Sequence, residues 1–95
     1  MTLTGKCKEE FEKWCIKEFG LKDELNIDLK ITESTHVGIQ LYDISGKIIS
    51  IIEDADFEIG SYSIHYQEIK ELTNGIYFIE FNIGSDRIVE KLVKH

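Results

Sequence analysis

The sequence predicts a mainly β protein: an immunoglobulin-like sandwich of about seven antiparallel strands, preceded by a short N-terminal α-helix. Apolar and polar side chains alternate repeatedly from residue 25 onward, as they do in half-buried strands. Turn-forming residues interrupt this alternation at intervals of about eight to twelve residues. Only the first twenty residues show helical spacing. We therefore expect a helix over residues 1–20 and a β-domain over residues 21–95, with a meander-like barrel as the alternative topology.

Length and composition describe one globular domain. The chain has 95 residues, of which 42% are hydrophobic and 31% charged, the balance of a chain that folds rather than stays disordered. Its formal net charge of −7 repels the phosphate backbone of nucleic acids, so nucleic acid is not expected as a partner. No apolar stretch approaches the roughly 20 residues needed to cross a bilayer. Residues 1–20 also lack the apolar core of a signal peptide.

The first twenty residues predict an amphipathic helix. Thr4 is a candidate N-cap, and Gly20 is placed to end the helix in the left-handed conformation. A helix of about 15 residues is marginal in water, so its apolar side must dock onto the β-domain, a second copy or another protein. We call the residues offered for this docking the interaction stripe: Phe11, Trp14, Cys15 and Phe19.

Helical geometry decides the interpretation of the two cysteines. On such a helix, Cys7 and Cys15 are about 12 Å apart, whereas a disulfide needs a separation below roughly 7 Å. We therefore expect buried thiols, with an intermolecular disulfide left open. The three histidines, His36, His65 and His95, show no ligand spacing with the cysteines, so no metal or other cofactor is predicted.

The first half of the β-domain contains three clear strands. Residues 25–31 alternate strictly between apolar and polar side chains, as do residues 37–42. Asp43-Ile44-Ser45-Gly46 breaks the second pattern with turn-forming residues, and residues 48–52 resume an apolar, β-branched run. The last two segments predict a β-hairpin.

The second half continues with shorter segments. An acidic break at residues 53–56 precedes a short strand at 57–59, a bend at 60–61 and a strand at 62–66. Ile69 and Leu72 suit one helical turn or a crossover loop, and Asn74-Gly75 suits a turn. Tyr77, Ile79, Phe81 and Ile83 are expected to face inward. Residues 87–94 mix charges into both alternating sets, which is typical of an edge strand.

Catalytic signatures are absent from the sequence. There is no nucleophile elbow, phosphate-binding loop or zinc-protease motif, so we expect no enzyme activity. His65 is expected to be solvated, and His36 to be an ordinary residue at the start of a strand. The acidic stretch Glu53, Asp54 and Asp56 is not an EF-hand, because His65 stands where the bidentate Glu would be needed. A looser cation site there is the alternative to a solvated turn.

Three motifs occur in a fixed order: Tyr42-Asp43-x-x-Gly46-Lys47, Gly75-x-Tyr77 and Lys91-Leu92-Val93. Their order and spacing resemble the C-terminal sorting domain of the Bacteroidetes type IX (Por) secretion system. The resemblance covers about the last 70 residues. It implies a folded, non-catalytic address label that is recognised in the periplasm by an outer-membrane translocation machine, and then commonly removed at the cell surface.

The resemblance also implies a set of recognition residues. They are Tyr42, Asp43, Gly46, Lys47, Gly75, Tyr77, Lys91, Leu92 and Val93. The structural alternative for each is that the glycines make turns, the tyrosines pack and Lys91 protects an edge. The implied partner is a protein, and the implied location is secreted or cell-surface, or cytoplasmic if Met1 is the true start. The alternative function is a stand-alone protein–protein interaction module that reuses the fold and self-associates through the N-terminal helix.

Overall fold

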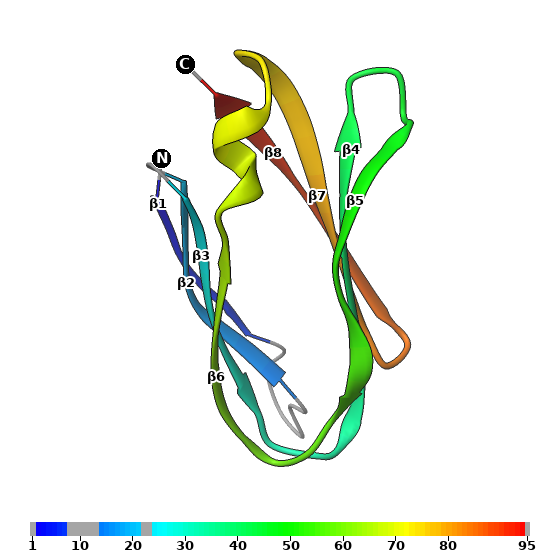
Figure 1. Ribbon diagram of the computed structural model, residues 1–95. Helices are drawn as coiled ribbons and strands as arrows, with labels where there is room; N and C mark the ends of the chain where they lie inside the picture. Colours follow the sequence, from blue (N-terminus) through cyan, green and yellow to red (C-terminus); the bar gives the residue numbers. More distant parts are fainter. Residues whose placement is uncertain (1, 8–13, 22–23, 95) are drawn as a thin grey trace. The chain divides into compact units, whose positions relative to one another are not determined.

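The computed structural model describes residues 2–7, 14–21 and 24–94, and the side chains of residues 24–94. Within these residues, eight strands form two four-stranded antiparallel sheets (Figure 1). The elements are β1 (Thr2–Cys7), β2 (Trp14–Leu21), β3 (Leu25–Ile31), β4 (Thr35–Asp43), β5 (Ile48–Phe57), β6 (Gly60–Tyr66), the 3-10 helix η1 (Glu68–Glu71), β7 (Gly75–Ile83) and β8 (Asp86–Lys94). The mainly β prediction is confirmed.

The chain divides into two compact units. Unit 1 contains Met1–Thr35 and Phe57–Leu72, and unit 2 contains His36–Asp56 and Thr73–His95. Each unit thus combines two segments that are separate in the sequence, and each carries one of the sheets. The immunoglobulin-like stacking of the two sheets, and the division at residue 20, stay predictions.

Unit 1 contains the sheet β1-β2-β3-β6. The apolar positions of β3 are buried, with Leu25 and Ile31 fully shielded from solvent, which confirms the first strand predicted from alternation. β3 pairs with β6 over its whole length, from Leu25 opposite Tyr66 to Ile31 opposite Gly60. After β6 the chain forms η1, the helical turn that was one of the two predicted alternatives, and its Ile69 is buried.

The predicted helix over residues 1–20 is wrong for the residues described there. β1 and β2 are antiparallel strands, and β2 also pairs with β3. The β2 register shifts between Ile16 and Glu18, where one extra residue forms a bulge. A bulge breaks the two-residue period and leaves apolar residues three apart, as with Ile16 and Phe19. A three-residue spacing also occurs in helices, so this part of β2 does not show the simple alternation of a strand.

Because β1 and β2 are paired strands, Cys7 and Cys15 lie closer together than the predicted helix would allow. In the pairing of β1 with β2, the Cα atoms of Cys7 and Cys15 lie opposite each other. Residues directly opposite in an antiparallel pair have Cα atoms about 4.5–5.5 Å apart. The predicted 12 Å separation assumed a helix, so the geometric argument against a bond within one chain no longer holds.

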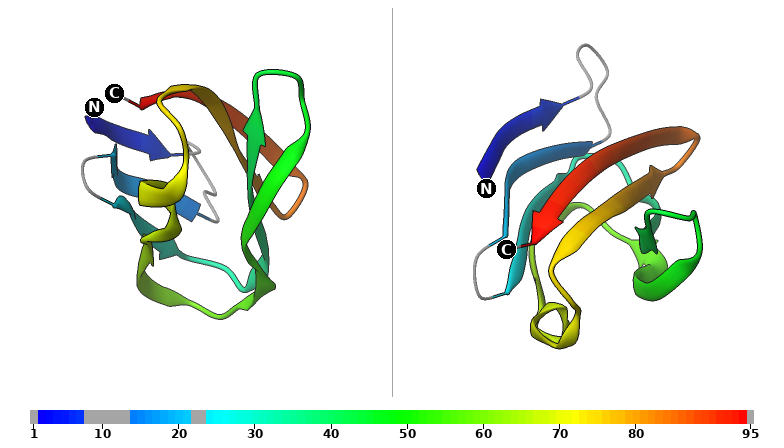
Figure 2. Two further views of the ribbon diagram at one scale, coloured as in Figure 1. Left: turned by 45° about the horizontal axis from the view of Figure 1, so that its top comes forward. Right: turned by 90° about the horizontal axis from the view of Figure 1, so that it is seen from above.

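Unit 2 contains the sheet β5-β4-β7-β8, in which β7 lies between β4 and β8 (Figures 1 and 2). The predicted inward set of β7 is buried throughout. Its neighbours across the β4 pairing are also buried, with Val37 opposite Ile83, Ile39 opposite Phe81 and Leu41 opposite Ile79. β8 is an edge strand of this sheet, as predicted.

The predicted acidic break is wrong, and it reduces the strand count between residues 25 and 94 from seven to six. β5 runs without interruption through the acidic residues to Phe57. Asp54 and Asp56 are exposed, while Ala55 and Phe57 between and after them are half-buried. Asp54 and Asp56 therefore occupy the wet side of an alternating strand, and their charges alone had suggested a polar turn.

Substitution of Leu92 tests whether β8 contributes to the core as described. Its side chain is fully buried and lies opposite Tyr77, so Leu92→Ala should lower the free energy of unfolding by about 2–5 kcal/mol. The neighbouring Val93 is half-buried, and Val93→Ala should cost clearly less. Urea denaturation of both variants measures the difference. Equal losses would contradict the assignment of Leu92 to the core.

Candidate functional site

The three sequence motifs lie side by side in unit 2. β7 pairs with β4 and β8, and one row across the three strands contains Tyr42, Phe78 and Lys91. The next row contains Asp43, Tyr77 and Leu92. Segments that are far apart in the sequence are thus adjacent in one sheet, although nothing in the linear spacing of the motifs fixed this register.

These rows assign different roles to the predicted recognition residues. Tyr77 and Leu92 are buried, and the Tyr77 hydroxyl donates a hydrogen bond of 2.6 Å to the backbone carbonyl of Thr73. Side chains one position away point to the opposite side of the sheet, which we call the polar face. Its members on β4, β7 and β8 include Gln40, Tyr42, Ile76, Phe78, Glu80, Asn82, Arg87, Val89, Lys91 and Val93.

The turn between β4 and β5 is organised by Asp43. Its Oδ1 atom accepts hydrogen bonds from the Ser45 hydroxyl at 2.6 Å, the Ser45 amide at 2.9 Å and the Lys47 amide at 3.0 Å. The Ser45 hydroxyl is the largest influence that lowers the pKa of Asp43, followed by the Lys47 amide. Gly46 has a φ of 88°, a left-handed conformation that side chains disfavour. Asp43 and Gly46 therefore shape the turn, and Lys47 is exposed beside it.

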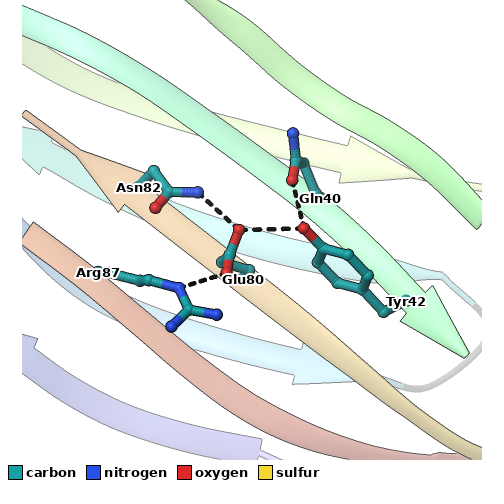
Figure 3. A network of polar contacts seen from close by, with 5 residues as sticks. All are labelled: Gln40, Tyr42, Glu80, Asn82 and Arg87. Atoms are coloured by element: carbon teal, nitrogen blue, oxygen red, sulfur yellow. Dashed lines mark hydrogen bonds and ion pairs between the residues drawn. The ribbon is translucent and has the colours of Figure 1, made fainter. Parts of the chain in front are cut away.

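A network of five polar side chains crosses the polar face (Figure 3). At its centre is Glu80, the one buried charged side chain among the described residues. Its Oε1 atom accepts from Asn82 Nδ2 at 2.8 Å and is 3.2 Å from the Tyr42 hydroxyl, which lies 2.7 Å from Gln40 Oε1. Its Oε2 atom accepts from Arg87 Nε at 2.5 Å. A buried carboxylate is stable here because it is both paired and hydrogen-bonded.

The network also shifts two pKa values. The hydrogen bond from Asn82 is the largest influence that lowers the Glu80 pKa; burial opposes it, and Arg87 and Tyr42 lower the pKa further. Burial raises the pKa of Tyr42, and the charge of Glu80 raises it further. Sequence alternation placed Glu80 on the wet side of its strand and missed this role. No sequence signal could have found it, because the contacts depend on the strand register that sets Gln40 opposite Glu80 and Asn82 opposite Arg87.

A groove of about 330 Å³ opens on the polar face beside the Asp43 turn. Apolar side chains of Ile44, Phe78 and Val89 line it together with Tyr42, Glu80 and Arg87. Ile44 and Val89 are 71% and 46% exposed, so the groove offers apolar surface to solvent. The groove lies entirely within unit 2 and was not predicted from the sequence.

His36 has a role that the sequence did not indicate. Its Nε2 atom lies 2.6 Å from Asp54 Oδ1, and its Nδ1 atom lies 2.8 Å from Asp56 Oδ1. Both nitrogens can donate only when the ring is protonated, and these hydrogen bonds, led by that with Asp56, raise the His36 pKa. The contacts connect β4 to β5. Within the described residues, no group of three or more His, Cys, Asp or Glu side chains could hold a metal ion.

The interaction stripe is not on a helix where the structure describes it. Trp14, Cys15 and Phe19 lie on β2, and Phe11 lies outside the described residues. His65 is exposed, as expected for a residue on the wet side of β6, and contacts Asn26 on β3. Within residues 2–7, 14–21 and 24–94, no helix is long and apolar enough to cross a membrane.

Gly46 and Gly38 provide a matched test of the turn. Gly46→Ala should destabilise the protein by about 1–2 kcal/mol, because a Cβ disfavours the left-handed conformation. Gly38→Ala should change stability by less than about 0.5 kcal/mol, since its Cβ would lie 3.8 Å from Asn82 Cβ, an ordinary contact. Thermal and urea unfolding compare the two. A Gly46→Ala variant as stable as the parent would contradict the turn geometry.

The His36 contacts predict a pH dependence. The folded-state pKa is raised above its ordinary value of 6.5, so these contacts stabilise the fold fully below that value. Their contribution is lost as the pH rises through the folded-state pKa. Replacing Asp54 and Asp56 with Asn should move the His36 pKa, measured by NMR of the ring protons, back toward 6.5. Glu53→Gln removes a carboxylate from the same strand and should leave the pKa in place; an equal fall would contradict the pairing.

Comparison with known proteins identifies the family. The model of the secretion system C-terminal sorting domain matches residues 21–95, which include all three motifs. No curated protein and no solved structure gives a significant match to the chain. The family match and the motifs agree, and the chain therefore belongs to the family of secretion system C-terminal sorting domains, the type IX (Por) family that its motifs resemble.

Proposed function

We propose that the chain is a non-catalytic sorting signal that the type IX machinery recognises in the periplasm and exports across the outer membrane. Family membership supports the sorting role. The observation that carries the proposal further is the register of β4, β7 and β8, which brings the three motifs into adjacent rows. A recognising protein would meet the exposed members of these rows together on one folded surface, although they are separate in the sequence.

In this proposal six of the nine recognition residues fall into two groups. Asp43, Gly46, Tyr77 and Leu92 hold the shape of the turn and the core. Lys47 and Lys91 are exposed, and Lys91 lies on the polar face next to Phe78. Exposed charged groups set the selectivity and speed of association more than its total affinity. The two lysines are therefore the members of the set best placed to be read directly.

The proposed sorting role implies where the protein is located and what it binds. The chain would be secreted or held at the cell surface, and its partner would be a protein of the export machinery. The stand-alone interaction module stays a prediction; its proposed self-association through an N-terminal helix loses its basis at β1 and β2, which are strands.

An export assay tests the proposal. The full chain is fused behind a periplasmic export signal and a fluorescent reporter, in a host that has the type IX machinery. We expect the reporter at the cell surface or in the medium. We expect Lys47→Gln and Lys91→Gln to reduce its export severalfold, because each removes an exposed charge beside the motifs.

Lys30→Gln is the matched control, because Lys30 is an exposed lysine of unit 1 outside the motifs. It should export like the parent. A folded reporter fusion that stays in the periplasm would overturn the sorting role. Normal export of both Lys47→Gln and Lys91→Gln would leave sorting intact but refute the assignment of these lysines.

A further inference from the structure

The guanidinium of Arg87 is hydrogen-bonded to Glu80 through only one of its three nitrogens. Arg87 is the sole arginine of the chain, and its side chain is 67% exposed at the groove on the polar face. Its Nε atom donates to Glu80 Oε2, and among the described residues no contact uses the two terminal nitrogens (Figure 3). A guanidinium presents its donors as a planar fork. Part of this fork is therefore available to a ligand.

Glu80 fixes the orientation of that fork. Its side chain is only 9% exposed, and both carboxylate oxygens are engaged, one by Arg87 and the other by Asn82 and Tyr42. The carboxylate cannot turn away without leaving these donors unpaired inside the protein, which is costly. A side chain that is already oriented loses less entropy on binding. Arg87 is thus preorganised rather than a freely moving surface charge.

Apolar side chains lie next to the Arg87 guanidinium in the groove. Phe78, Val89 and Ile44 line the groove beside Arg87. Val89 and Ile44 are largely exposed, so a ligand that covers them gains by removing apolar surface from water. A small inorganic anion would leave this surface wet. The groove therefore favours a ligand with an anionic group next to apolar ones.

The charges around the groove disfavour a doubly charged ligand. Asp43 and Glu80 also line the groove, and each carries a carboxylate. A doubly charged phosphate would be repelled by both, whereas a carboxylate is repelled half as strongly and matches the guanidinium fork in shape. Lys91, on the same face, adds attraction for an acidic partner.

We propose that this groove binds an acidic, apolar peptide segment of a partner protein. A carboxylate of the segment accepts hydrogen bonds from the terminal nitrogens of Arg87, and its apolar neighbours cover Phe78 and Val89. The proposal goes beyond the export role and does not depend on it, because the isolated chain should bind such a peptide in the absence of any secretion machinery.

NMR titration of the isotope-labelled full chain with acetyl-Leu-Asp-Leu-amide tests the proposal. We expect saturable shifts of the amide signals of Phe78 and Val89 and of the Arg87 Nε–H signal. Acetyl-Leu-Asn-Leu-amide, which lacks the charge, should bind about tenfold more weakly, the value of one charge-assisted hydrogen bond. Equal binding of the two peptides, or tighter binding of inorganic phosphate, would refute the assignment.

Two variants locate the site. Arg87→Gln should weaken binding of the acidic peptide about tenfold. Val89→Glu places a negative charge in the groove, leaves the Glu80 network in place and should weaken binding at least as much, so the test survives if Arg87→Gln fails to fold. Ile76→Glu is the matched control, because Ile76 is exposed on the same face but does not line the groove. Losses as large in this control would overturn the proposal.

Discussion

β7 is hydrogen-bonded on both sides, and this constraint determines the arrangement of unit 2. A strand with two neighbours cannot slip by one residue without breaking both ladders and turning its apolar set toward water. Tyr77, Ile79, Phe81 and Ile83 therefore stay in the core, and Phe78, Glu80 and Asn82 stay on the other side. The positions of the β4 turn and of Lys91 on β8 follow from the same register.

The polar face shows how a strongly acidic chain can present a basic group. Burying Glu80 alone would be unfavourable, and hydrogen bonds from Asn82, Tyr42 and Arg87 offset that cost. The arrangement neutralises one carboxylate of a chain with a net charge of −7 and leaves the Arg87 side chain 67% exposed. The motifs shared with the family support this face from beneath through Tyr77 and Leu92.

Alternation predicted the mainly β class and most strands of unit 2, because a strand with one buried face alternates apolar and polar residues in the sequence. Alternation gave wrong predictions where a bulge or a cluster of charges interrupted the pattern within a strand. The bulge in β2 leaves a three-residue spacing that also occurs in helices, and the charges of Asp54 and Asp56 imitated a turn within β5. Sequence patterns also missed Glu80 and His36, whose partners come from neighbouring strands. The registers that join them depend on tertiary pairing, which a local period does not contain.

The interleaved connectivity of the two units has a consequence for synthesis on the ribosome. Sheet β5-β4-β7-β8 takes its strands from residues 35–57 and 75–94, so its first half must wait while the segment between them is made. A nascent chain interrupted before β8 would lack one of the two neighbours of β7 and the leucine that closes the core against Tyr77. Incomplete translation products would then lack the folded surface on which the proposed sorting role depends.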